Sequence, residues 1–251
     1  MASRRGQLID GVLLLDKPEG LSSNHALQRA KRALDARKAG HTGTLDPFAT
    51  GLLVCCLGRA TKLAGQLLDS DKGYLATIQF GVETDSGDLT GSVTAEADSD
   101  FPGIDAQALE AILPEFRGDI EQVPPMHSAL KRDGKPLYKY ARAGIEVERP
   151  PRQVTIHRLE VVSHTPREAV IDVVCSKGTY IRTLAQDIGR RLGCGAHLTA
   201  LRRTRVGPFH VDDAVALDKL QTMDTPQSIL ISLDDLPADL TQTVFGKKDT
   251  L

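Results

Sequence analysis

The sequence has no apolar run long enough to cross a membrane and no segment typical of a secretory signal. Its longest unbroken apolar run is the segment Leu52 to Leu57, whereas a membrane-spanning helix needs about 18 residues. The basic start, Met1 to Arg5, is followed by no long apolar stretch, so we expect no secretory leader. The cysteines number four, and two of them are adjacent at Cys55 and Cys56. This usage favours a reduced, cytoplasmic setting.

The sequence also lacks the motifs of several common enzyme classes. The segment Gly40–Gly43 has neither the spacing nor the lysine of a phosphate-binding loop. None of the serines lies in a nucleophile-elbow pattern. The seven histidines show no spacing typical of metal ligands. We therefore expect no metal site and no cofactor.

The composition is that of a folded, globular protein. Of the 251 residues, 41% are hydrophobic and a further 22 are glycine, close to the globular average of about 45–50% apolar residues. This excludes a disordered or fibrous protein. At roughly 150 residues per domain, the length predicts one or two domains.

The net charge of −2 conceals a strong alternation of charge along the chain. Residues 1–62 have a net charge of +5 and residues 126–210 one of +9, whereas residues 63–125 have −11 and residues 211–251 have −5. Two basic segments of this size suggest two surfaces for a polyanion. Solvated charge without a binding role is the alternative.

Apolar periodicity and turn residues predict strands and helices that interleave along the chain. Several strands follow one another directly, with turn signals between them, so the expected class is α+β with a mixed, mostly antiparallel sheet. The proline- and cation-rich segment 123–152 is expected to be a long exposed loop or hairpin, and loops of that length are often functional. The expected strands are 11–15, 52–57, 74–80, 154–162, 168–175 and 198–206. The expected helices are 25–34, with Ser22 or Ser23 as the cap at its start, and 60–69, 105–116, 181–192 and 214–220.

The segment Gly40–Gly51 concentrates two threonines, a histidine and a carboxylate between glycines, directly before a buried strand. Its carboxylate, Asp46, precedes Pro47. An isolated Asp-Pro pair is usually a structural turn. Two further segments favour a functional role: Cys175–Thr183, where a strand end leads into a helix, and Asp71–Tyr74.

Four segments together resemble the bacterial tRNA pseudouridine synthase B (TruB) family: Gly11–Pro18, Gly40–Pro47, Ser176–Arg182 and Gly193–Leu198. The resemblance covers residues 8 to about 225 and does not extend over the last 25 or so residues. It implies the α+β pseudouridine-synthase fold, in which a mixed, mostly antiparallel central sheet is flanked by helices and loops.

The resemblance implies that Asp46 is the catalytic carboxylate. Pseudouridine formation breaks the N1–C1′ bond of a uridine, turns the base and bonds C5 to C1′. The sugar carbon becomes electron-poor as the base leaves, so a carboxylate facing C1′ can stabilise or attack it. Hydrolysis of a glycosidic bond normally needs two carboxylates, whereas here no water has to be activated. Formation of a sugar ester and abstraction of a sugar proton both remain open.

The resemblance also assigns the other site residues. Arg182 would pair with Asp46 and keep it ionised, and Tyr180 would lie beside the reacting ring. A uridine in folded RNA must be flipped out before it can react, and the aromatic ring of Tyr74 would stack on it. The further residues expected near the flipped nucleotide are His41, Leu201, Lys17 and Lys62.

Segment 123–152 resembles the mobile RNA-clamping segment of the family. Cations interleaved with Tyr138 and Tyr140 suit phosphate pairing combined with base stacking. An inert charged loop is the alternative. The cations expected to bind RNA are Lys131, Arg132, Lys135, Lys139, Arg142, Arg202 and Arg203.

The domain organisation expected from the resemblance is a catalytic domain over residues 1–225 and a C-terminal tail over residues 226–251. The small C-terminal RNA-binding domain usual in the family would then be absent or truncated. The expected partner is the T-arm stem-loop of tRNA, modified at its T-loop uridine (U55) by a monomer in the cytoplasm.

Two other functions compete with an isomerase. A non-catalytic RNA-binding module or RNA chaperone on the same fold would bind RNA without forming product. A glycoside or nucleoside hydrolase would need a second positioned acid, for which Asp85 and Asp88 are the candidates, and it would release free uracil.

Overall fold

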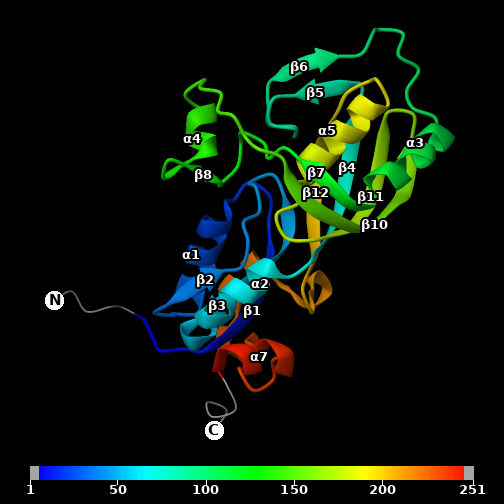
Figure 1. Cartoon of the computed structure of the whole chain (residues 1–251). Helices are drawn as coiled ribbons and strands as arrows, with labels where there is room; N and C mark the ends of the chain where they lie inside the picture. Colours follow the sequence, from blue (N-terminus) through cyan, green and yellow to red (C-terminus); the bar gives the residue numbers. More distant parts are fainter. Residues whose placement is uncertain (1–5, 246–251) are drawn as a thin grey trace. The chain divides into compact units, whose positions relative to one another are not determined.

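The computed structural model describes residues 6–245 (Figure 1) and has the expected α+β class. The chain divides into two compact units. The first contains residues up to Gly73 and from Arg202 onward, and the second contains Tyr74–Leu201. The boundary near residue 225, expected from the sequence between a catalytic domain and a C-terminal tail, stays a prediction.

In the first unit, the buried strand β1 (Gly11–Lys17) lies between two partners. It pairs antiparallel with β3 (Thr50–Leu57) and parallel with β14 (Val215–Ala216). The short strand β2 (Ala39–His41) and the end of β12 (Ala196–Val206) also pair with β3. The unit further contains β13 (Phe209–His210), the helices α1 (Ser23–Ala33), α2 (Ala64–Asp69), α6 (Leu217–Thr222) and α7 (Ala238–Phe245), and the 3₁₀ turns η1 (Gly58–Leu63), η3 (Val211–Asp213) and η4 (Pro226–Ile229).

Both faces of the β1–β3 pair are buried, which explains why the sequence of β3 is continuously apolar. Cys55 and its neighbours at alternate positions face a cluster completed by α1 and α6. Cys56 and its alternate neighbours face a second cluster completed by η1, α2 and α7. Burial raises the pKa of the Cys56 thiol to about 12 and raises that of Cys55 as well. Both cysteines are therefore core residues with unreactive thiols.

The chain beyond residue 225 returns to this core. Ile231 and Val12 exchange two backbone hydrogen bonds of 2.9 Å. Leu236 and Leu240 are buried in the same cluster as Cys56. The part of the expected C-terminal tail that the structure describes, up to residue 245, is thus packed on the first unit by ordinary apolar burial. The last residues of that expected tail, 246–251, lie outside the described residues.

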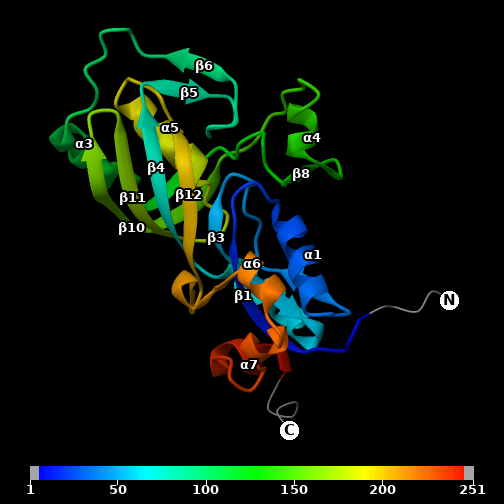
Figure 2. The same ribbon diagram turned by 180° about the vertical axis from the view of Figure 1, so that it is seen from behind.

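The second unit is a sheet in the order β12, β4 (Lys72–Phe80), β11 (Glu168–Cys175), β10 (Arg152–Thr165) and β7 (Gly118–Gln122). The pairs β10–β11 and β10–β7 are antiparallel. Helix α5 (Ile181–Arg191) covers one face of this sheet, because it lies in front of the strands in Figure 1 and behind them in Figure 2. A separate hairpin, β5 (Val82–Thr84) and β6 (Val93–Glu96), the helix α3 (Ala106–Ile112) and the turn η2 (Leu113–Phe116) complete it.

Segment 123–152, expected to be a long loop or a hairpin, contains a short hairpin followed by a helix. The two-residue strands β8 (Lys131–Arg132) and β9 (Lys135–Pro136) form a hairpin, followed by the short helix α4 (Leu137–Ala141). Asp133 and Gly134 both have positive φ, at 51° and 75°, as a tight type I′ turn requires. This small module stands away from the strands of its own unit in both views (Figures 1 and 2).

Candidate active site

Asp46 lies in the loop between β2 and β3 and is half-buried. The backbone N–H and the backbone C=O of the preceding residue, Leu45, are both hydrogen-bonded to the Ser23 hydroxyl. The backbone N–H of Leu45 donates to Ser23 Oγ at 2.7 Å, and Ser23 Oγ lies 3.0 Å from the Leu45 carbonyl oxygen. Two buried cations hold the loop further along its length.

The first buried cation is Lys17, the last residue of β1, whose side chain is fully buried. Its ammonium donates to the carbonyl oxygens of Pro18 at 2.8 Å, Leu21 at 2.7 Å and Pro47 at 3.3 Å. Burial lowers its pKa to about 8, opposed by the attraction of Asp46. The sequence places Lys17 among the basic residues near the site, and that role stays a prediction. In the structure its ammonium is bound by backbone carbonyls, one of them that of Pro47, the residue after Asp46.

The second buried cation is Arg203, only 1% exposed. Its guanidinium donates to the carbonyl oxygens of Leu52 at 2.8 Å, Gly43 at 3.2 Å and Thr44 at 3.5 Å. The sequence assigns Arg203 to the RNA-binding surface, and the structure places it inside the fold, because backbone carbonyls of the Asp46 loop take up its donors. No sequence signal distinguishes it from the neighbouring Arg202.

His41, the last residue of β2, is half-buried and close to the same loop. Burial lowers its pKa, and the positive charge of Arg203 lowers it further. The imidazole is therefore neutral at pH 7. Among the described residues, its Nδ1 atom and the hydroxyl of Thr42 are buried without a hydrogen-bond partner. A neutral ring with one unused nitrogen can donate to or accept from a nucleotide, and the nucleotide contact expected from the sequence stays a prediction.

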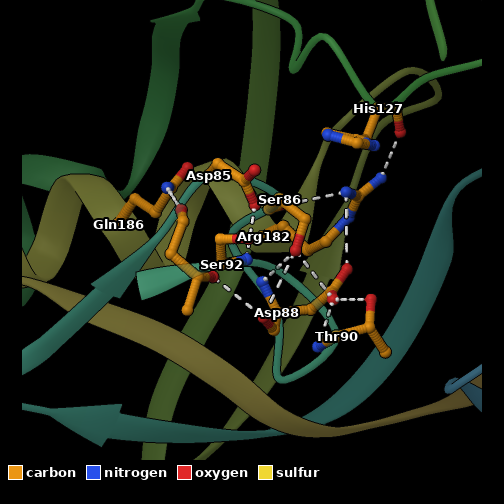
Figure 3. A network of polar contacts seen from close by, with 9 residues as sticks. Asp85, Ser86, Asp88, Thr90, Ser92, His127, Arg182 and Gln186 are labelled. Atoms are coloured by element: carbon orange, nitrogen blue, oxygen red, sulfur yellow. Dashed lines mark hydrogen bonds and ion pairs between the residues drawn. The ribbon is translucent and has the colours of Figure 1, made fainter. Parts of the chain in front are cut away.

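In the second unit, Arg182 is the centre of a buried polar network (Figure 3). It is the second residue of α5 and only 4% exposed. Nη1 donates to the Ser86 carbonyl oxygen at 2.7 Å and lies 3.5 Å from Asp88 Oδ2, and Nη2 donates to the His127 carbonyl oxygen at 2.7 Å. The guanidinium plane is thereby held in one orientation.

The carboxylate of Asp88 has several partners of its own. It accepts from the hydroxyls of Ser86 at 2.9 Å and Thr90 at 2.6 Å and from the Thr90 backbone N–H at 2.9 Å. Asp85 lies in the same connection between β5 and β6 as Asp88, and its carboxylate accepts from the Ser92 N–H at 2.9 Å (Figure 3). These interactions favour a structural role for both carboxylates over that of a second hydrolytic acid.

Tyr180 is the N-cap residue of α5, and its side chain is half-buried. Tyr74 in β4 is also half-buried, and Leu201 in β12 is 7% exposed. Asp46 belongs to the first unit, whereas these three residues and Arg182 belong to the second. Their convergence on one uridine, including the pairing of Arg182 with Asp46, stays a prediction.

The cations of segment 123–152 are in contact with its tyrosines. Lys135 Nζ lies 4.4 Å from the ring centroid of Tyr140, and Arg142 Cζ lies 5.5 Å from that of Tyr138. These cation–π contacts explain the interleaving seen in the sequence. The cations in this segment with exposed side chains are Lys131, Arg132, Lys139, Arg142 and Arg152.

Two other residues expected to contact substrate lie at the surface of the first unit. Lys62 in η1 is exposed. Arg202 is half-buried and forms a two-point ion pair with Asp16, with N···O distances of 3.0 and 2.7 Å. An RNA phosphate at Arg202 would have to compete with that carboxylate.

Neither a metal-binding cluster nor a membrane-spanning helix occurs within residues 6–245. That part of the chain has no group of three or more histidine, cysteine, aspartate or glutamate side chains that could hold a metal ion. None of its helices is long and apolar enough to cross a membrane.

Comparison with known proteins identifies the family. Residues 31–181 match the model of the TruB family pseudouridylate synthase N-terminal domain, and residues 182–236 match that of the tRNA pseudouridylate synthase B C-terminal domain. The tRNA pseudouridine synthase B of Bordetella avium (strain 197N) is 70% identical over 240 residues, covering 96% of this chain and 98% of that protein. The protein of the same name from Chromobacterium violaceum is 59% identical, covering 91% and 74%.

Solved structures agree with these sequence matches. A crystal structure of a Cbf5-Nop10-Gar1 complex contains a similar chain, with a TM-score of 0.69 and 29% identity. The similarity covers 90% of this chain but 60% of that one. An H/ACA RNP bound to a substrate RNA containing 2′-deoxyuridine gives a TM-score of 0.66 at 26% identity, again over 90% and 60% of the two chains. The protein belongs to the TruB family of pseudouridylate synthases.

Proposed function

We propose that this protein converts the T-loop uridine (U55) of tRNA into pseudouridine, with Asp46 as the catalytic carboxylate. The observation that carries the proposal is how the Asp46 loop is held. Backbone groups on both sides of Asp46 are bound by Arg203, Ser23 and Lys17, at Gly43–Thr44, Leu45 and Pro47 respectively. A carboxylate held in advance at the reacting sugar is the main requirement of this reaction, because no water or cofactor takes part.

The isomerisation needs few protein groups. The N1–C1′ bond breaks, the uracil turns, a C5–C1′ bond forms, and the proton released from C5 is balanced by one taken up at N1. Asp46 acts at the sugar while C1′ is electron-poor. The Tyr74 ring stacks on the flipped uracil, and Tyr180 lies beside it. Arg182, oriented by the network around Asp88, pairs with the Asp46 carboxylate and keeps it ionised.

The RNA is held chiefly by exposed cations. We assign phosphate contacts to segment 123–152, whose small hairpin and helix present most of these side chains. His41 and Leu201 contact the nucleotides next to the uridine, and Lys62 and Arg202 extend the basic surface. All these contacts fall on the T-arm, so a T-arm stem-loop is a sufficient substrate for one copy of the protein acting in the cytoplasm.

The test is to incubate the purified protein with an unmodified tRNA transcript and to map pseudouridine along it. One pseudouridine at position 55 is expected, and also in an isolated T-arm stem-loop; a transcript with cytidine at that position should remain unmodified. Tight binding without product would instead identify an RNA-binding module or chaperone. Release of free uracil would identify a hydrolase.

A further inference from the structure

The side chain of Gln122 is tied to the backbone of Tyr180. Gln122 is the last residue of β7 and only 2% exposed. Its Nε2 donates to the Tyr180 carbonyl oxygen at 3.2 Å, and its Oε1 accepts from the Tyr180 N–H at 2.9 Å. A single buried amide therefore binds both backbone polar groups of Tyr180, as a neighbouring β-strand would.

These two hydrogen bonds restrain the backbone of Tyr180, from which its side chain projects. Tyr180 has an extended backbone, with φ −101° and ψ 107°, and it precedes the first turn of α5 without a side-chain cap. With both its N–H and its C=O bound to Gln122, the residue is restrained on either side of its Cα atom. Because the Cα–Cβ bond is fixed by the backbone, Gln122 restrains the direction in which the Tyr180 side chain leaves the main chain. Productive geometry tolerates errors of only about 0.5 Å.

The same amide lies where the RNA-binding segment begins. Segment 123–152 starts at the residue after Gln122, and Arg182 donates to the carbonyl oxygen of His127, near the start of that segment. Tyr180 and Arg182 are thus both hydrogen-bonded to residues 122–127. The placement of these two residues and the first residues of the RNA-binding segment depend on one another.

We infer that Gln122 is a positioning residue that aims Tyr180 at the reacting base. This inference rests on the proposed function, since it assumes that Tyr180 acts on the flipped uridine. Because Gln122 is buried, we expect it to contact neither the base nor the RNA phosphates. It should therefore affect the chemical step far more than the binding of tRNA.

The test measures single-turnover rates at saturating tRNA and dissociation constants for Gln122→Met, Tyr180→Phe and the double variant. Methionine has a similar volume but cannot make either hydrogen bond. We expect Gln122→Met to slow the reaction about 10- to 100-fold, with less than about a threefold change in binding. In the Tyr180→Phe background, the fold reduction in rate caused by Gln122→Met should be at least about five times smaller than in the parent, because the effects of coupled residues are not additive.

The control is Gln153→Met on the adjacent strand β10. Gln153 is exposed, and its amide donates to Glu121 at 3.4 Å without contacting Tyr180. Its rate should equal that of the parent. If Gln122→Met does not fold, Gln122→Glu takes its place, because it retains an acceptor for the Tyr180 N–H and lacks the donor.

The possible results separate the two proposals. An unchanged rate for the Gln122 variants, or losses that multiply in the double variant, would overturn the positioning role while the parent still forms pseudouridine. A parent protein that forms no pseudouridine would overturn the proposed function itself.

Discussion

Arg203 Nε donates a 2.8 Å hydrogen bond to the carbonyl oxygen of Leu52, a residue 151 positions earlier in the chain. The same guanidinium reaches Gly43 and Thr44, so one side chain joins β12, β3 and the Asp46 loop. The conformation of the Asp46 loop therefore depends on Arg203, a residue that is far from the loop in sequence and shares no motif with it.

Replacing Arg203 with methionine should destabilise the protein by about 1.5–3 kcal/mol, because hydrogen bonds from a charged donor to buried carbonyls are lost. Urea unfolding measures the change. Arg202→Met is the matched control and should cost less than about 1 kcal/mol, since it breaks a half-exposed ion pair. Equal costs at the two positions would contradict the loop-holding role of Arg203.

Asp46→Asn should abolish turnover while leaving folding and tRNA binding nearly unchanged. The amide has almost the shape of the carboxylate, so the fold should be retained, whereas the negative charge opposite C1′ disappears. Pseudouridine formation and tRNA affinity are measured side by side. Turnover close to that of the parent would exclude Asp46 as the catalytic carboxylate.

Asp88→Asn should both destabilise the protein and slow the reaction. An amide in place of the carboxylate weakens both the interaction with the buried Arg182 guanidinium and the hydrogen bonds that Asp88 accepts. We expect the free energy of unfolding to fall by about 1.5–3 kcal/mol. Loss of the fixed guanidinium orientation should lower the single-turnover rate at least about tenfold. Asp85→Asn is the control, because Asp85 is exposed and does not form an ion pair with Arg182. A rate effect as large at Asp85 would argue against the specific role of Asp88.

Stability should fall as the pH is lowered through 6.5, in part because of His41. Burial and the positive charge of Arg203 lower its pKa below 6.5, the usual value for histidine, so below that pH the unfolded chain binds a proton that the folded protein does not. The His41→Gln variant should lose this part of the acid sensitivity. Free energies of unfolding of the parent and the variant, measured from pH 8 to pH 5, should diverge as the pH falls. Parallel curves would show that His41 is protonated alike in both states.

Neutralising Lys131, Arg132, Lys135 and Lys139 together to glutamine should weaken tRNA binding and reduce its salt dependence. Each phosphate contact that is lost should reduce the log–log slope by about 0.7–0.9. Binding is measured at several salt concentrations. Lys219→Gln on α6, exposed and outside the segment, should leave the slope unchanged. An unchanged slope in the fourfold variant would place the segment away from the RNA.

Local pattern was enough to predict the longest strands and helices. The alternation of apolar residues in β4, the continuous apolar run of β3 and the serine before α1 all correspond to observed structure. The Ser22 hydroxyl accepts from the His25 N–H at 3.2 Å, as an N-cap should. These features were predictable because periodicity and capping act over a few neighbouring residues.

Strand β7 and helix α7 were not predicted. Gly118–Gln122 contains one apolar residue, Ile120, and becomes a strand because its backbone pairs with β10. In α7, Leu240 joins a cluster whose other members come mostly from the first 70 residues of the chain and from β12 and β13. Non-local pairing of this kind leaves no periodic signature in a short segment.

The sequence by itself determined the family, the α+β class and the segments that carry the candidate site residues. Only the tertiary structure decided what the cations do. In sequence, Lys17, Arg182 and Arg203 are three basic residues among 31 lysines and arginines. In the fold all three are buried and donate to backbone carbonyls. Because every residue has a carbonyl group, sequence pattern marks none of these partners, and only chain folding selects which of them a buried cation meets.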